Sequence, residues 1–479
     1  MELDTSMQYK WTALTVTILG TLTSGLASRI IIIGLPTISA ELHAGAAEVT
    51  WVGQAYLLAT TVLVLVIGKI SDVYGRVKLY NIGFLFFTLG SILAAISANL
   101  NQLMVLMVMQ GVCAAILTTN TVTIITDASP TNELGRFLGI SQTAYRFGSI
   151  IAFTAGGIIL TYLNWRGLFY PNIIIGLVGT ALGYKKLKEL SLEETNRKLD
   201  WLGFILFVLG LLLVLISITY LSYGLSNVVQ GTAMLGIGLV IILLFFKAEQ
   251  RSTNPLLDLN LLKIRIFASN NLAMLLNAVT WGAILLLLSL YLQIGLGHSP
   301  LYTGLALVPL DIVYLFSTVI FGNLSDKYGT RLFCTLGLVI TALSFLVTSL
   351  FNASTSYPEI LASMCIIGLG NSMFSSPNMS AIMNSVPSNR RGVSSGFLNA
   401  MFGVGFTISY GLTILFITFG IRYSVLSSLV QHNMPGPLLP FAQIQFFNGF
   451  HICALILTVI SLIAAIPASL KPNITTNQP

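Results

Sequence analysis

Charged residues are scarce in this sequence. Asp, Glu, Lys and Arg together make up 8% of its 479 residues, whereas a soluble domain carries about 25%. So few charges cannot cover the water-facing surface of a chain this long, and this excludes an ordinary soluble protein. Hydrophobic residues make up 55% of the sequence, which indicates a membrane protein with several spans.

The motifs of metal, nucleotide and catalytic sites are also missing. There is no G-x-x-x-x-G-K-[ST] phosphate loop, no G-x-S-x-G elbow and no metal-ligand spacing among the four histidines. The net charge of +7 is spread over short connectors rather than gathered in a basic run. We therefore expect no enzyme activity, no cofactor, no metal and no nucleic-acid partner. The four cysteines stand singly in apolar runs, which predicts buried thiols.

Long apolar runs are what the sequence has in abundance. A helix that crosses a bilayer needs about 20 mostly apolar residues, and fourteen runs of this kind occur. We expect an all-α integral membrane protein with fourteen transmembrane helices. The spans are predicted near 12–38, 49–68, 79–98, 102–126, 137–162, 167–184, 202–222, 231–247, 267–293, 301–322, 332–351, 358–384 (interrupted by Pro377), 393–419 and 447–469.

The basic residues predict the orientation of these spans. If the amino terminus is cytoplasmic, 19 Lys and Arg fall in inner segments, and only Arg166 and Arg422 fall in outer ones. Cytoplasmic connectors are enriched in Lys and Arg, so both termini are expected in the cytoplasm. We expect a multi-pass protein of the plasma membrane that functions as a monomer.

One short motif occurs twice. Residues 68–76 and 322–331 both read G-x-x-S-D-x-Y-G followed by Arg, and both come directly after a predicted span. This repetition predicts two homologous halves related by an axis along the membrane normal. Glycines suit a tight turn and close helix contact, and the aspartates suit a helix amino terminus or an arginine. The expected gate residues are Gly68, Asp72, Gly75, Arg76, Gly322, Asp326, Gly329 and Arg331, with Arg76 and Arg331 at the phosphate surface.

The first copy resembles the signature loop of the major facilitator superfamily, and the second copy is similar to the loop of that family's second half. The fourteen spans resemble the drug:proton antiporter branch of the family. Further matches are Leu35-Pro36-Thr37-Ile38, Gln110-Gly111, Trp165-Arg166 with Phe169 and Asn172, and Arg391-Gly392.

The resemblance implies two six-helix bundles related by a pseudo-two-fold axis, with two extra central helices between them. The corresponding domains are residues 1–190, 191–262 and 263–479. It also implies secondary active transport by alternating access, with export of amphipathic or cationic drugs in exchange for protons. The partners would be a small-molecule substrate, protons and the lipid bilayer.

The sequence departs from that branch at three places. Ala27 and Met107 stand where the branch usually has an aspartate and an arginine. The antiporter motif of the fifth span keeps only its ends, so Gly148, Gly156 and Gly157 are the gate residues that it contributes.

Three ionisable residues lie within predicted spans, where such groups are costly and often functional. They are Arg29, Arg146 and Asp311. Asp311 lies about eleven residues before the second motif, hence roughly 16 Å from it along a helix. Structural alternatives are that Arg29 reaches the outer headgroups, that Arg146 pairs with Asp127 or Asp72, and that Asp311 pairs with Arg29 or a hydroxyl.

Neutral polar and aromatic residues on the same spans are further candidates for binding substrate. Aromatic faces attract flat or cationic molecules, whereas amides within spans also bridge helices. The candidates are Gln54, Tyr56, Gln110, Asn120, Gln142, Tyr145, Asn277, Trp281, Gln293, Tyr314, Asn399 and Tyr410.

The sequence is compatible with three functions. The first is proton-coupled efflux of amphipathic or cationic compounds. The second is transport of an organic anion held between Arg29 and Arg146. The third is a membrane sensor built on a transporter fold, although the sequence offers no sizeable soluble domain to carry a signal.

Overall fold

The structure, a computed structural model, describes residues 2–129, 134–189, 200–224, 227–252, 255–257, 259–386, 391–432 and 440–470. Within these ranges the regular secondary structure is helical, and fourteen helices are long and apolar enough to cross a membrane. The fourteen-span prediction is therefore confirmed.

The helices follow one another in three groups. The first half contains α1 (Glu2–Leu42), α2 (Ala46–Tyr74), α3 (Arg76–Ala95), α4 (Leu100–Ala128), α5 (Leu134–Tyr162), the short η1 (Trp165–Phe169) and α6 (Tyr170–Lys186). The central pair is α7 (Trp201–Ser222) and α8 (Val228–Arg251), followed by η3 (Leu259–Lys263). The second half contains α9 (Arg265–Leu290), η4 (Tyr291–Gly295), α10 (Pro300–Tyr328), α11 (Thr330–Thr348), α12 (Tyr357–Asn384), α13 (Arg391–Ile417), α14 (Tyr423–His432) and α15 (Pro440–Ser469).

Side-chain caps define where several helices begin. Asn99, Asp200 and Ser299 each accept a hydrogen bond from the backbone N–H three residues later, at the starts of α4, α7 and α10. Such caps satisfy amide groups that have no partner within the helix. They therefore set the ends of spans whose interiors are apolar almost throughout.

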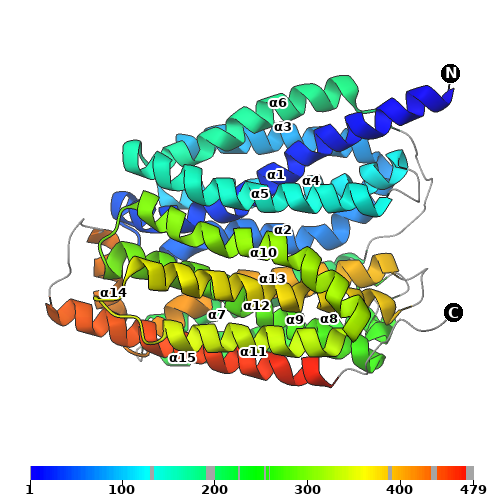
Figure 1. Cartoon of the computed structure of the whole chain (residues 1–479). Coiled ribbons are helices and arrows are strands. Elements are labelled where there is room, and N and C mark those ends of the chain that lie inside the picture. Colours follow the sequence, from blue (N-terminus) through cyan, green and yellow to red (C-terminus); the bar gives the residue numbers. More distant parts are fainter. Residues whose placement is uncertain are drawn as a thin grey trace.

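The two halves lie side by side, as Figure 1 shows. Helices α1 to α6 pack mainly on one another, as do α9 to α13 with α15. The halves meet along α5 with α10 and along α2 with α13, and α7 packs against both α8 and α13. The ends that carry Gly75 and Gly329 lie on one side of the molecule, which we call the motif end. The opposite side, where α14 lies, is the far end.

Large apolar side chains cover the outside of the helices. About two-thirds or more of the residue surface is exposed at Val229, Leu243, Val105 and Phe316. Water would penalise this arrangement, whereas lipid tails would not. The surface thus agrees with a membrane-embedded protein.

Two local expectations differ from the structure. Pro377 does not interrupt its span, because α12 continues on both sides of it. The ten-residue α14 was not predicted as a helix. A helix of that length gives no membrane-span signal, and it is placed by its contacts with the first half of the chain.

Candidate functional site

An ion pair joins the two halves near the middle of their contact. Nη1 of Arg146 on α5 lies 3.6 Å from Oδ1 of Asp311 on α10. The Asp311 side chain is 1% exposed, and within the described residues neither carboxylate oxygen accepts a hydrogen bond. The guanidinium of Arg146 also lies over the ring of Tyr314, 3.9 Å from its centroid. The Tyr314 hydroxyl in turn donates to Oγ of Ser375 at 2.9 Å.

Arg29 on α1 joins this group from another side. Its guanidinium carbon lies 4.7 Å from the ring centroid of Phe406 and 6.0 Å from that of Trp281. Arg29 is 2% exposed and lies within electrostatic range of Asp311. It therefore does not reach outward to the headgroups, and Asp311 faces both the buried Arg29 and the partly exposed Arg146.

Tyrosines complete the group. The Tyr145 hydroxyl and Oγ of Ser28 share a hydrogen bond of 3.1 Å, which links α5 to α1. Tyr410 on α13 is buried and lies within electrostatic range of both Arg29 and Tyr145. Tyr56 on α2 is buried and lies near Tyr145.

We call this set the central cluster. It brings together eight of the residues predicted from the sequence. Its members come from α1, α2 and α5 of the first half and from α9, α10 and α13 of the second half. The members are Ser28, Arg29, Tyr56, Tyr145, Arg146, Trp281, Asp311, Tyr314, Phe406 and Tyr410.

The central cluster carries unequal charge. It contains two guanidinium groups and one carboxylate, which leaves an excess of one positive charge. Every other Asp or Glu in the part of the chain that the structure describes stands near a helix end or in a connecting segment. Charges buried at such a junction are strongly coupled because little solvent screens them.

Two other predicted amides bridge helices. Gln293 donates to the Ile33 carbonyl at 3.1 Å, and Asn371 donates to Asn277 at 3.2 Å. This is an ordinary role of an amide within a span. Gln54 differs, because it is fully buried beside Gly411 of α13 and its amide makes no hydrogen bond within the described residues.

The remaining predicted polar residues also lie outside the central cluster. Gln110 is buried against Gly90 on α3. Asn120 donates to the Ile116 carbonyl of its own helix at 2.9 Å. Gln142 and Asn399 are exposed.

At the far end, α5 and α10 contact each other through glycine. A Cβ atom on Gly304 of α10 would lie 2.1 Å from the Phe153 carbonyl oxygen of α5. A Cβ atom on Gly157 of α5 would lie 2.7 Å from Cα of Leu301. No side chain fits at either position, so glycine lets the two halves approach to backbone contact.

Helix α14 closes the same end against α2. The first helical residues, Ala46 and Ala47, donate their backbone N–H groups to Oγ of Ser427 at 3.4 Å and to the hydroxyl of Tyr423 at 3.3 Å. Gly45 has no side chain with which to cap α2, so the second half supplies acceptors that its own helix start lacks. Burial raises the pKa of the Tyr423 phenol, which keeps this acceptor neutral.

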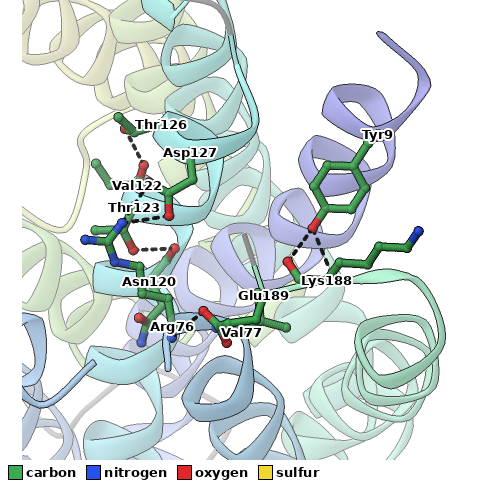
Figure 2. Close-up of polar contacts among 10 residues, drawn as sticks. All are labelled: Tyr9, Arg76, Val77, Asn120, Val122, Thr123, Thr126, Asp127, Lys188 and Glu189. Atoms are coloured by element: carbon green, nitrogen blue, oxygen red, sulfur yellow. Dashed lines mark hydrogen bonds and ion pairs between the residues drawn. The ribbon is translucent and has the colours of Figure 1, made fainter. Parts of the chain in front are cut away.

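The motif end of the first half is held by ion pairs and caps within that half. Gly75 has a φ of 98°, which favours glycine at the turn between α2 and α3. Arg76 donates to both carboxylate oxygens of Asp127 at the end of α4, at 2.6 and 2.7 Å. Figure 2 shows this contact. Arg76 was expected at the phosphate surface, but the Asp127 carboxylate binds it instead.

A second residue at this end, Glu189, was not predicted from the sequence. Its carboxylate accepts hydrogen bonds from the backbone N–H groups of Arg76 and Val77 at 2.9 and 3.0 Å (Figure 2). It also accepts one from the backbone N–H of Lys78 at 3.2 Å. A carboxylate at a helix amino terminus is favoured by the helix dipole. Its position 113 residues after Arg76 hides this contact from any local pattern.

The remaining gate candidates differ in how tightly they pack. Gly329 repeats the turn of Gly75 with a φ of 90°, and Arg331 is exposed. Gly148 contacts the α1 backbone, since a Cβ atom there would lie 2.3 Å from the Leu22 carbonyl oxygen. Gly68, Gly156 and Gly322 have more space, with nearest atoms at 3.8, 3.2 and 3.0 Å. The side chains of Asp72 and Asp326 lie outside the described residues.

Comparisons with known proteins agree with the fold and with a transport role. The sequence model of the Major Facilitator Superfamily matches residues 17–410 and 271–471. The riboflavin transporter RibZ of Clostridioides difficile is 30% identical over 421 residues, covering 87% of this chain and 90% of that protein. The multidrug efflux pump LfrA of Mycolicibacterium smegmatis is 26% identical over 400 residues, covering 82% of this chain and 78% of that protein.

Solved structures show the same fold at lower identity. A bacterial homologue of the human lysosomal transporter Spinster, in an inward-facing and unoccupied conformation, superposes with a TM-score of 0.68 at 16% identity over 96% of both chains. A D-xylose–proton symporter gives a TM-score of 0.67 at 15% identity, covering 98% of this chain and 99% of that chain. From the match over most of its length, we conclude that this chain belongs to the Major Facilitator Superfamily of membrane transporters and is not an enzyme.

Proposed function

We propose that this protein is a proton-coupled exporter of amphipathic small molecules that works by alternating access, with Asp311 as the proton carrier. The observation that carries the proposal is the buried Asp311 carboxylate, 3.6 Å from Arg146 and without a hydrogen bond within the described residues. A carboxyl group in the middle of a span is a common proton relay in transporters. Relatives named for multidrug resistance and efflux support the direction and the type of substrate.

The ion pair links protonation to the contact between the halves. With Asp311 charged, the pair attracts α5 to α10 and favours the contact seen at the far end. Protonation of Asp311 neutralises the carboxylate that lies within electrostatic range of Arg29 and Arg146. The attraction between Arg146 on α5 and Asp311 on α10 is then lost, which favours separation of the halves at the far end.

The orientation follows from the basic connectors. The motif end faces the cytoplasm in this proposal, because cytoplasmic connectors are enriched in Lys and Arg. Export then consists of loading from the motif end and release at the far end, across the plasma membrane. A sensor without transport has less support, because the relatives named above are transporters and a pump.

The substrate itself is best sought among flat amphipathic compounds. A relative named as a riboflavin transporter makes riboflavin one compound to test. The excess positive charge of the central cluster gives no support to the cationic drugs expected from the family resemblance. We therefore include substrates of each charge in the experiment.

The experiment measures lumenal pH in sealed proteoliposomes with an imposed proton gradient. Riboflavin, a lipophilic cationic dye and an aromatic carboxylate are added separately to wild type, Asp311→Asn and Asp127→Asn. Substrate-driven proton movement in wild type should fall at least about tenfold in Asp311→Asn, because the carrier is lost. It should persist in Asp127→Asn, whose carboxylate pairs with Arg76 outside the central cluster. Equal proton movement in wild type and Asp311→Asn would contradict the proposal.

A further inference from the structure

Arg29 has hydrogen-bonding capacity that the protein does not use. Its Nε and Nη1 atoms are buried and make no hydrogen bond within the described residues. The side chain as a whole is 2% exposed. Burying a charged group without hydrogen bonds is costly, so a group held this way is ready for a partner that the polypeptide does not supply.

The neighbours of Arg29 attract its charge without occupying its N–H groups. Phe406 and Trp281 offer ring faces at 4.7 and 6.0 Å, and cation–π attraction needs no N–H donor. Asp311 lies within electrostatic range, but it forms its ion pair with Arg146. One carboxylate therefore faces two guanidinium groups, and within the described residues it accepts no hydrogen bond from Arg29.

The same rings extend into two aromatic pairs. Trp281 lies 5.8 Å from Tyr314, and Phe406 lies 5.8 Å from Tyr410, measured between ring centroids. These pairs come from α9 with α10 and from α13, all in the second half. Arg29 reaches them from α1 in the first half, so an acid held by Arg29 would meet aromatic faces of the other half.

We propose that Arg29 is the residue that selects the charge of the substrate, and that it binds the acidic group of a planar aromatic anion whose ring packs against Trp281 and Phe406. The guanidinium fork matches a carboxylate in a bidentate arrangement. This inference rests on the proposed transport function and gives the two arginines different roles. Arg146 holds the proton carrier Asp311, and Arg29 holds the substrate.

The test compares two probes that share a ring system and differ in charge. Naphthoate and naphthylmethyl-trimethylammonium are bound to purified full-length protein in lipid nanodiscs, without a proton gradient, and measured by equilibrium dialysis. Wild type should bind naphthoate more tightly than the cation. Arg29→Gln should weaken naphthoate binding by about 10- to 100-fold, and Arg29→Lys should weaken it less because the charge remains.

Arg166→Gln is the matched control. Arg166 also stacks on an aromatic ring, with its guanidinium carbon 4.4 Å from the Trp165 centroid, but it pairs with Glu41 outside the central cluster. This variant should bind naphthoate as wild type does. Folding of Arg29→Gln is checked by its binding of the cation, which should become tighter once the excess charge is gone.

Two results would overturn the inference: tighter binding of the cation than of naphthoate by wild type, or equal naphthoate binding by wild type and Arg29→Gln. The proton-coupling proposal fails separately. Proton movement unaffected by Asp311→Asn, together with Arg29-dependent naphthoate binding, would remove the proposed proton carrier and retain the substrate site.

Discussion

The two ends of this transporter are held together in different ways. At the far end, contacts cross between the halves: Gly304 lies against the Phe153 backbone, and α14 caps the start of α2. At the motif end, the described ion pair and caps stay within the first half, as Arg76 with Asp127 and Glu189 show. A contact between halves must break when that end opens, whereas a contact within one half can persist. In the proposed transport cycle the far end is therefore the closed gate, and the contacts described at the motif end join helices of the first half.

The largest effect is expected when a methyl group is added between the halves at the far end. Gly304→Ala places a Cβ atom 2.1 Å from the Phe153 carbonyl oxygen of α5. Such overpacking costs about 1–3 kcal/mol, so we expect the far end to open and transport to fall by about tenfold or more. Transport in proteoliposomes and thiol labelling of a cysteine placed at Ala46, which is buried beneath α14 at the far end, would measure both effects.

The matched control for that variant is Gly396→Ala on α13. A Cβ atom there meets nothing within 4 Å. Alanine in place of a helical glycine stabilises by up to about 1 kcal/mol, so transport and labelling should remain as in wild type. Equal loss of transport in both variants would show that helical glycine itself matters, and not the contact between the halves.

A smaller effect is expected when the α14 contact is removed. Tyr423→Phe combined with Ser427→Ala deletes both acceptors at the start of α2. Loss of helix caps costs about 0.5–2 kcal/mol, which should raise the labelling rate of a cysteine placed at the buried Ala46 several-fold while the protein stays folded. Ser424→Ala, an exposed neighbour on α14, is the control and should label as wild type does. An unchanged rate in the double variant would mean that α14 does not hold the gate.

The smallest effect on gating is expected at the motif end. Glu189→Gln weakens the cap on three N–H groups of α3. We expect a loss of roughly 0.5–1 kcal/mol of stability in the first half, seen as a lower thermal unfolding midpoint. The far-end labelling rate should not change. A large change in that rate would show that this cap responds to opening and is not confined to one half.

The sequence predicted the fold far better than it predicted the site. Apolar runs and the positions of Lys and Arg defined fourteen spans, because a bilayer imposes both length and composition on a helix. Arg29, Arg146 and Asp311 stood out for the same reason, since ions within spans are costly. Their pairing could not be predicted, because it depends on how α1, α5 and α10 pack.

Contacts between distant segments explain what the sequence could not predict. An amide such as Gln293 suits a helix contact as well as a binding site, and only the packing of α1 against the second half brings it to the Ile33 carbonyl. Glu189 lies in a connector and caps a helix 113 residues earlier. Contacts of this range leave no periodic pattern in a sequence.

Alternating opening of the two ends can be tested directly by measuring distances between pairs of spin labels. Tyr74 and Tyr328 occupy matching positions of the two motifs and are exposed, and Leu163 with Ser424 provides a pair at the far end. Distances would be recorded in nanodiscs at neutral pH and at acidic pH, where Asp311 becomes protonated in this account. We predict that acidification lengthens the far-end distance and shortens the motif-end distance, and that Asp311→Asn shows the acidic distances at both pH values. Two distances that stay constant or lengthen together would contradict alternating access controlled by Asp311.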